Sequence, residues 1–387
     1  MRRRQYDSLA FKAGIKTTSM RIVAFLLFGL VMIGMGCRTE SVTPPPVQEI
    51  TWQLGPFEKL DAVNPIMAPE AEGQRFVCPV RNSTVEWEAR NVLNPTALVR
   101  DGKVHMIYRA QDEHMTSRLG LATSSDGIHF EKLPEPIFYP EEDSLKQYEW
   151  PGGVEDPRIV ESPDGRYIMT YTAYDGKTAR LLLASSPDLE NWTKHGLVMG
   201  YGKYRDTWSK SGAIVCEMQE NGRCVATKIK GKYWMYFGDT NLFVASSEDL
   251  ISWEVAENAE NGKMISVLAP RPGYFDSRLV EPGPFALLTD AGIILIYNAS
   301  NAANFNDASL PKFTYAAGQA LFDRDNPVKL IDRSEEFFIH PDKDYERVGE
   351  VNEVVFVEGM VDFRDSLYLY YGTADRMIAV ARGVQQD

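Results

Sequence analysis

The stretch PGGVEDPRIV (151–160) places two neighbouring carboxylates, Glu155 and Asp156, between a Gly-Gly pair and a proline. Glycine permits backbone angles that other residues avoid, and Pro157 removes a hydrogen-bond donor and so interrupts a strand. The apolar residues that follow resume a strand-like pattern. We therefore expect both carboxylates on a tight turn at a strand entrance, where a rigid scaffold can hold groups for acid–base chemistry.

Other acidic side chains complete a set of candidates for such chemistry. Beside the pair in the turn, we consider Asp239, Asp276, Glu281 and Asp375. The sequence contains no serine nucleophile elbow, phosphate loop or dinucleotide fingerprint, and no Cys/His spacing typical of a metal site. Carboxylates in a chain with 18 Tyr and 7 Trp favour glycoside cleavage, which needs one protonated carboxyl and one carboxylate. We expect no cofactor and no metal.

A recurring tyrosine-rich strand indicates how these residues are positioned. It occurs five times, with starts 60 to 75 residues apart: VHMIYRA (104–110), YIMTYTAYD (167–175), KYWMYFGD (232–239), GIILIYNAS (292–300) and LYLYYGTAD (367–375). Apolar and polar residues alternate with period two, and helical periodicity is nearly absent. A fixed period near 65 residues indicates repeated sheets. The sequence therefore predicts an all-β fold, a five-bladed β-propeller.

Polar residues at comparable places after these apolar runs are candidates for a shared central site. They are Arg109, Asp175, Asp239, Asn298 and Asp375. Side chains from all blades of a propeller converge on its central channel, so five polar ends at one level favour a common pocket. The alternative for each residue is that it only caps its own strand or turn.

The net charge of −13 narrows the choice of partners. It argues against nucleic acid or an anionic membrane surface as the main partner, because both would repel an acidic protein. Neutral ligands such as sugars remain compatible with this charge.

The N-terminal region carries an export signal. The stretch MRIVAFLLFGLVMIGMGC (20–37) has a basic start, a short apolar run and a small-residue end at Cys37, which is typical of a bacterial lipoprotein signal peptide. We expect a signal peptide over 1–36 with Met20 as a second possible start, a disordered tether over 37–50 and a catalytic propeller over 51–387. Lipidated Cys37 would attach the protein to a membrane of the cell envelope. An ordinary signal peptide is the alternative.

Three further cysteines remain, namely Cys78, Cys216 and Cys224. Cys216 and Cys224 flank an Asn-Gly turn signal, so a short hairpin disulfide is compatible with export. The sequence leaves open whether they are bridged.

Seven motifs in order resemble glycoside hydrolase family 130: NPTALVRDGKVHMIYRA, SRLGLATSSDGIHF, GGVEDPRIV, YTAYDG, GKYWMYFGD, FDSRLVEPGP and LYYGTAD. The resemblance covers about residues 90 to 382. It implies a five-bladed propeller that acts on β-mannosides. Most members of this family are inverting phosphorylases, and some members hydrolyse their substrate instead.

The resemblance also implies roles for individual residues. The aspartate of the Glu-Asp-Pro-Arg turn is the general acid, here Asp156, and in the family it acts through a substrate hydroxyl that relays the proton. Asn94, Arg109 and Asp375 match positions that hold the sugar at the cleavage site. Arg158 would fix the turn, and Glu155 would orient it or bind a hydroxyl. Further candidate sugar-binding residues are Lys210, Asp239 and Asp276.

The second substrate decides between hydrolysis and phosphorolysis. Phosphorylases of the family often carry a His-Arg pair where this chain has Phe237-Gly238-Asp239, and small residues where it has Glu281. A carboxylate repels phosphate but can activate water, so Glu281, or Glu217 as a second candidate, is expected as the base. We therefore favour an inverting β-mannoside hydrolase, with carboxyls ~6.5–9.5 Å apart.

Two alternatives stay open at this point. One is a β-1,4-mannosyl-glycoside phosphorylase, which would use inorganic phosphate as a co-substrate. The other is a non-catalytic propeller that binds envelope glycans, although an intact Glu-Asp-Pro-Arg turn argues against it. The sequence does not specify the linkage, the leaving-group sugar or the oligomeric state.

Overall fold

The computed structural model describes residues 52–70 and 73–383. The expected signal peptide, the tether and Cys37 lie outside the described residues. Regular structure within these ranges is almost entirely β-strand, with two single-turn helices, α1 (Lys146–Glu149) and α2 (Asp344–Arg347). Neither helix has the length and apolar character needed to cross a membrane.

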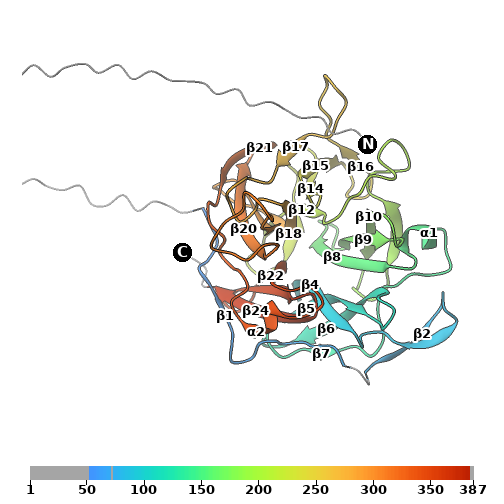
Figure 1. Ribbon diagram of the computed structural model, residues 1–387. Helices are drawn as coiled ribbons and strands as arrows, with labels where there is room; N and C mark the ends of the chain where they lie inside the picture. The colour runs from blue at the N-terminus through green and yellow to red at the C-terminus, as the bar shows by residue number, and fades with distance from the viewer. Residues whose placement is uncertain (1–51, 71–72, 384–387) are drawn as a thin grey trace, which may run out of the picture. The chain divides into compact units, whose positions relative to one another are not determined.

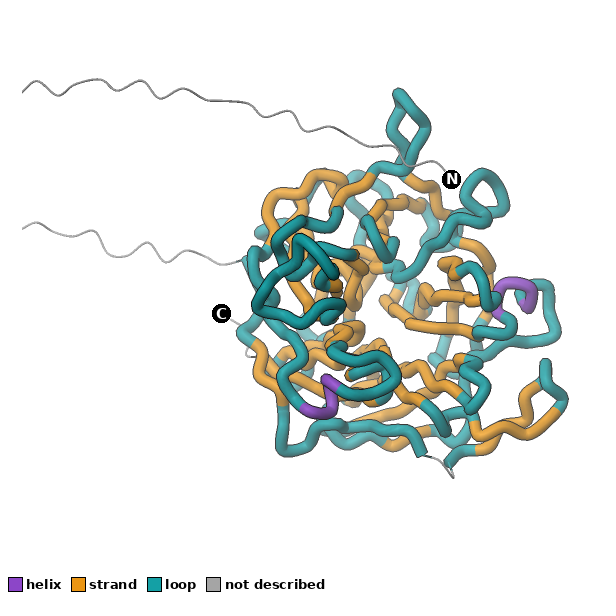
Figure 2. The backbone as a smooth tube through the Cα atoms, in the orientation of Figure 1, coloured by secondary structure: helices purple, strands orange, loops and turns teal. Residues whose placement is uncertain are grey.

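Strands in the described residues form five antiparallel sheets around a common centre, as the period of the sequence predicts (Figures 1 and 2). The first blade consists of β4 (Asn91–Arg100), β5 (Lys103–Gln111), β6 (Ser117–Ser124) and β7 (Glu131–Lys132). The second consists of β8 (Gly153–Glu161), β9 (Tyr167–Tyr174), β10 (Ala179–Ser186) and β11 (Thr193–Leu197).

The third blade has a more complex outer edge than the others. It consists of β12 (Ala213–Met218), β14 (Tyr233–Phe237) and β15 (Leu242–Ser247), and both β16 (Trp253–Val255) and β17 (Ser266–Leu268) pair with β15. The end of β12 also forms a hairpin with β13 (Cys224–Ala226). The fourth blade consists of β18 (Leu279–Leu288), β19 (Ile293–Ser300), β20 (Tyr315–Asp323) and β21 (Asn326–Arg333).

The fifth blade joins the two ends of the described chain. It contains β22 (Val355–Asp362), β23 (Leu367–Thr373) and β24 (Met377–Gly383), and its fourth strand is β1 (Phe57–Lys59) from the N-terminal side. The pairing of Phe57 with Gly383 closes the ring with backbone hydrogen bonds. A separate hairpin of β2 (Arg75–Cys78) and β3 (Ser83–Glu86) follows β1.

The innermost strands are irregular at the same relative position. Register shifts interrupt the pairing of β4, β8, β18 and β22 with the next strand of their blade. The residues at or beside these shifts include Asn94, Asp156, Glu281 and Glu358. A β-bulge bends a strand and re-aims a side chain, and bulges are frequent beside active sites. The inner strands therefore present a ring of polar residues.

The recurring tyrosines have a structural role between strands. In four blades the hydroxyl of a buried tyrosine on the second strand donates to a buried carboxylate: Tyr108 to Glu88, Tyr171 to Glu149, Tyr297 to Asp276 and Tyr371 to Glu346. Each carboxylate also pairs with a cation on the outermost strand: Lys132, Lys194, Arg333 and Lys59. The carboxylates are 0% exposed, so water cannot replace a lost partner. Removing one partner of such a pair would leave a buried, unpaired charge and strongly destabilise the fold.

This repeat corrects the prediction for Asp276. It is the fourth-blade member of the tyrosine–carboxylate–cation repeat, and its side chain is saturated by Tyr297, Arg271 and Arg333. With no exposed surface it is unable to bind a sugar.

The hairpin disulfide that the sequence left open is not formed in the structure. Cys216 on β12 and Cys224 on β13 are free thiols, as is Cys78. In the register of the hairpin, Cys224 lies opposite Met218 and Cys216 opposite Ala226. The two cysteines are therefore diagonal neighbours rather than a directly facing pair.

Candidate active site

Asp156 lies at the bulge of β8, between Glu155 and Arg158, in the left-handed conformation with φ 50°. This conformation is unusual for a residue other than glycine and is found where the surrounding structure enforces it. The Asp156 Oδ1 accepts hydrogen bonds from Asn94 Nδ2 and from an Arg109 guanidinium nitrogen, both at 2.9 Å. The side chain is 2% exposed, so it is held in one orientation.

Glu155 shares the same arginine. The second terminal nitrogen of Arg109 lies 2.7 Å from Glu155 Oε1, and the Ser117 hydroxyl donates to the same oxygen at 3.3 Å. Gly153 allows this approach, because a Cβ at its position would lie 2.2 Å from the Ser117 carbonyl oxygen. Gly153 also has a φ of 104°, which other residues rarely adopt. The predicted tight turn is therefore present, and Arg109 binds both of its carboxylates.

Lys210 links this turn to the fourth blade. Its Nζ lies 3.4 Å from Asp156 Oδ2 and 3.7 Å from Glu281 Oε1. The Ser211 hydroxyl, on the neighbouring residue, donates to the same Glu281 oxygen. Ser211 also has a positive φ, 57°, directly before the inner strand of the third blade. Glu281 is 4% exposed and therefore depends on these two partners.

Arg158 ties three inner strands together beneath the turn. Its guanidinium donates to the carbonyl oxygens of Pro282 and Gly283 at 2.8 and 2.9 Å, and to that of Asp156 at 3.0 Å. It also forms an ion pair at 2.9 Å with Glu358 on β22, and both side chains are almost fully buried. Arg158 therefore fixes the turn, as predicted, and does so too deep in the fold to reach a substrate.

The charges and the burial of the site shift the pKa values of its carboxylates in different directions. Burial alone would raise the pKa of Asp156, but the positive charges of Arg109 and Lys210 outweigh it and hold the pKa well below its usual range. Burial raises the pKa of Glu281. The positive charge of Lys210 acts in the opposite direction but offsets only part of this rise. Burial also raises the pKa of Asp375, to about 6, against the lowering effect of Arg109. Strongly perturbed carboxylates in one place are characteristic of catalytic sites.

Asp239 lies beside this cluster rather than within it. The Gly238 amide donates to the Lys210 carbonyl oxygen at 2.9 Å, which holds the β14–β15 turn against the site. The Asp239 carboxylate accepts a hydrogen bond from the Trp208 indole at 2.6 Å. Its predicted place at the site is therefore compatible with the structure, in a half-buried position.

Glu217 lies at the opposite end of its strand. Ser211, before β12, contacts Glu281, whereas Glu217 is near the far end of β12 and pairs with Val225 in the hairpin. Because each strand residue advances about 3.3 Å, the steps from Ala213 to Glu217 alone carry Glu217 roughly 13 Å along β12, away from Ser211. The prediction of Glu217 as a candidate base is therefore wrong.

Two of the five polar strand ends have structural roles instead. Asp175 accepts backbone hydrogen bonds from its own turn and pairs with Arg180. The Asn298 side chain exchanges two hydrogen bonds with the backbone of Val357, at 2.7 and 2.8 Å, and so joins β19 to β22. Arg109 and Asp375 reach the cluster, and the expectation of a shared site holds for part of the set only.

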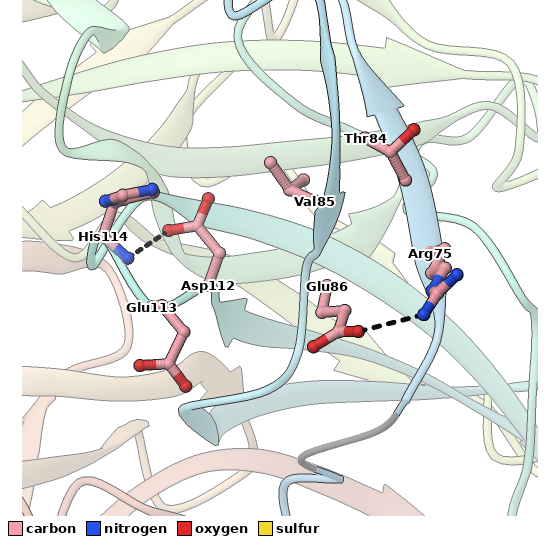
Figure 3. Close-up of a pocket in the computed structure, with 7 residues that line it drawn as sticks. All are labelled: Arg75, Thr84, Val85, Glu86, Asp112, Glu113 and His114. Atoms are coloured by element: carbon pink, nitrogen blue, oxygen red, sulfur yellow. Dashed lines mark hydrogen bonds and ion pairs between the residues drawn. The ribbon is translucent and has the colours of Figure 1, made fainter.

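A separate cavity lies outside the cluster, between the β2–β3 hairpin and the turn after β5 (Figure 3). It has a volume of about 410 Å³ and is lined by Arg75, Thr84, Val85, Glu86, Asp112, Glu113 and His114. Among these residues, Arg75 and Glu86 form an ion pair at 3.5 Å, and the His114 backbone amide donates a hydrogen bond to the Asp112 carboxylate at 2.9 Å (Figure 3). None of the predicted catalytic residues lines this cavity.

Sequence reasoning missed Ser117, Ser211 and Glu358. A local signal could have found the last two. Four inner strands carry a polar residue followed by proline or glycine at or beside their irregular point, and the same pattern stands just before the inner strand of the third blade. These dipeptides are Asn94-Pro95, Asp156-Pro157, Ser211-Gly212, Glu281-Pro282 and Glu358-Gly359. Both second residues weaken regular strand pairing.

A five-bladed propeller whose centre gathers buried carboxylates, arginines and a lysine is the arrangement of a carbohydrate-active enzyme. The comparisons with known proteins agree with this class. A family model described as beta-1,4-mannooligosaccharide phosphorylase matches residues 59–387. The chain belongs to glycoside hydrolase family 130, whose members act on β-mannosides.

Individual relatives carry two kinds of name. A 1,2-beta-oligomannan phosphorylase from Thermoanaerobacter sp. (strain X514) is 32% identical over 82% of this chain and 94% of its own. The crystal structure of a putative glycoside hydrolase from Parabacteroides distasonis is 44% identical, with a TM-score of 0.84 over 87% of this chain and 98% of its own.

A further solved structure, 43% identical, has a TM-score of 0.83 over 87% of this chain and 97% of its own. Its description says that the family of mannoside phosphorylases contains glycoside hydrolases that target β-1,2 mannosidic linkages in Candida mannan.

Proposed function

We propose that this protein hydrolyses β-mannosides, with β-1,2-linked manno-oligosaccharides as the substrate class, and inverts the anomeric centre. Asp156 is the source of the proton for the leaving oxygen, and Glu281 is the base that activates water. The 43% identical structure supports this proposal, because its description names hydrolases of β-1,2 linkages.

The balance of charge in the cluster is the observation that carries the proposal. Its three cations are Arg109, Arg158 and Lys210, and each already contacts at least one carboxylate. The carboxylates at or beside them are Glu155, Asp156, Asp239, Glu281, Glu358 and Asp375. A phosphate dianion needs surplus positive charge at its binding site, and this cluster offers none.

The proton bookkeeping of the reaction follows from the same contacts. In the empty site the cations keep Asp156 ionised, so it must gain a proton as substrate enters. Sugar hydroxyls that accept from Arg109 and Lys210 would weaken their hold on Asp156 and raise its pKa. A substrate hydroxyl would then relay this proton to the glycosidic oxygen while Glu281 takes a proton from the attacking water. Exchange with solvent restores both carboxyls.

Phosphorolysis is the second candidate, and the curated relatives favour it. The 32% identical relative is a 1,2-beta-oligomannan phosphorylase, and the matching family model carries a phosphorylase description. One structural feature also supports it: Arg278 forms no ion pair with any described residue, and its guanidinium instead donates to the Ser300 hydroxyl at 3.4 Å and lies over the Phe313 ring. If phosphate enters the site, this exposed guanidinium is its free cationic partner.

Products formed with and without phosphate distinguish the two reactions. Purified protein is incubated with β-1,2-mannobiose in plain buffer and in buffer with inorganic phosphate, and products are separated by anion-exchange chromatography. Hydrolysis gives mannose alone in both samples. Formation of mannose 1-phosphate in the second sample would show that the reaction is phosphorolysis and not hydrolysis. In that case the Arg278→Ala variant should no longer form mannose 1-phosphate. A propeller that only binds glycans would give neither product.

A further inference from the structure

Trp208 is a half-exposed aromatic residue beside the cluster. Its side chain lies in the loop before β12, two residues from Lys210, and 48% of its surface is accessible. Large aromatic side chains are normally covered, because each buries 150–250 Å² of mostly apolar area, about the most of any residue. An exposed indole at the edge of a polar site therefore needs an explanation.

The orientation of the indole is fixed from two sides. Its Nε1 donates to Asp239 Oδ2 at 2.6 Å, and its ring meets that of Tyr174 edge-on, with centroids 6.4 Å apart and planes at 66°. Tyr174 in turn packs closely over Gly152, where a Cβ would lie 2.3 Å from the tyrosine ring. The tryptophan is held rigidly although half of it faces solvent.

The two residues that hold the indole, Tyr174 and Asp239, also connect it to the two sides of the proposed site, that of Asp156 and that of Glu281. Gly152 is near the start of β8, the strand that carries Asp156, so Tyr174 connects Trp208 to the acid side. The turn that carries Asp239 is bonded to Lys210, and its Thr240 carbonyl accepts from the Val280 amide at 3.4 Å, next to Glu281. Trp208 therefore contacts Tyr174 at the end of a second-blade strand and Asp239 at a turn of the third blade.

We propose that Trp208 is a stacking platform for a second pyranose ring of the substrate, outside the cleavage position. This inference rests on the proposed action on β-mannosides. One face of a pyranose is lined by C–H groups and is apolar, so it gains by covering an exposed indole, while the sugar hydroxyls stay in water. Because the ring is already fixed by Asp239 and Tyr174, stacking costs little ordering of the protein.

The platform gives the enzyme selectivity for chain length. A single mannose occupies only the cleavage position and does not reach the indole, whereas mannobiose and longer chains cover it. We expect Trp208 to contribute to the affinity for oligosaccharides and to contribute nothing to the affinity for mannose itself.

Calorimetric titration of an inactive variant tests this. Glu281→Gln is used as the background, because Glu281 acts on water and its loss leaves the sugar contacts in place. In that background, Trp208→Ala should weaken β-1,2-mannobiose binding roughly tenfold to a hundredfold, the range of an aromatic anchor at an interface. Trp208→Phe should recover part of the loss, and mannose binding should not change.

Tyr201→Ala is the matched control. Tyr201 lies in the same loop and is 63% exposed, but its hydroxyl lies over Gly196 on the outer strand β11. This variant should bind both sugars like its parent. Equal mannobiose affinity in Trp208→Ala, or an equal loss for mannose and mannobiose, would overturn the platform and leave the proposed function intact. A parent that binds neither sugar would overturn the proposed function as well.

Discussion

Asp156 and Glu281 lie on different blades, yet their nearest carboxylate oxygens are at most about 7.1 Å apart, because Lys210 Nζ is 3.4 Å from one and 3.7 Å from the other. Inverting glycosidases separate their two carboxyls by ~6.5–9.5 Å to leave room for water. This upper bound overlaps only the lower end of that range, so the proposed acid and base are held no farther apart than the closest spacings of such enzymes. Arg109 together with this lysine lowers the pKa of Asp156, and the lysine also limits the rise in the pKa of Glu281.

Asp156→Asn should abolish most activity and preserve the fold. Asparagine tolerates the positive φ of this position, and its amide oxygen can still accept from Asn94 and Arg109. It cannot supply a proton, so the rate on unactivated mannosides should fall ~10²–10⁴-fold. Steady-state kinetics measure the rate, and thermal unfolding measures the fold. Near-native turnover would remove Asp156 from the mechanism.

Asp375→Asn should stabilise the protein above pH 6 and weaken catalysis. Since burial raises the pKa of Asp375 to about 6, the folded protein binds this proton more tightly than the unfolded chain does. Stability is therefore lost as pH rises from about 4, the unfolded pKa, to about 6. Removing the charge should recover roughly 1–2 kcal/mol at pH 8 and almost nothing at pH 4. Melting curves at both pH values check this, and an equal gain at both would contradict it.

Cys37→Ser should release the protein from membranes. The short apolar run that ends at Cys37 indicates a lipoprotein signal, and we propose that the mature protein is anchored to the bacterial cell envelope through this cysteine. The parent protein should sediment with membranes after expression in its full length, whereas the variant should stay soluble or unprocessed. If both forms partition alike, the anchor is not on Cys37.

The period of the tyrosine-rich strands was sufficient to predict five blades. In four of them the tyrosine bridges the second strand to a buried carboxylate, and in the third blade Tyr236 donates to the Pro327 carbonyl oxygen instead. The same regularity could not identify which carboxylates face the axis. Asp276 belongs to the bridging repeat, while Glu281, five residues later, belongs to the site. The difference arises from the bulge that follows Glu281, and bulges leave only a weak proline or glycine signal.

The direction of a strand explains the error on Glu217. Sequence distance alone suggested that a glutamate near SKSGAIVC could face the site, and the part of that stretch that does so is its beginning, Lys210 and Ser211. After Ser211 the chain follows β12 away from the charged cluster around Lys210 and Glu281. Glu217→Gln therefore serves as a control that should leave activity unchanged.

The most direct test of the account is the anomer first released by the wild-type protein and by Glu281→Gln. Proton NMR during cleavage of methyl β-1,2-mannobioside, whose leaving sugar is a methyl glycoside and gives no free anomer, should show α-mannose before mutarotation, at a rate that added phosphate does not increase. Glu281→Gln should be slower by ~10²-fold or more, since an amide cannot accept the proton of water. Release of β-mannose, or a severalfold acceleration by phosphate with α-mannose 1-phosphate as the product, would contradict a water-activating Glu281.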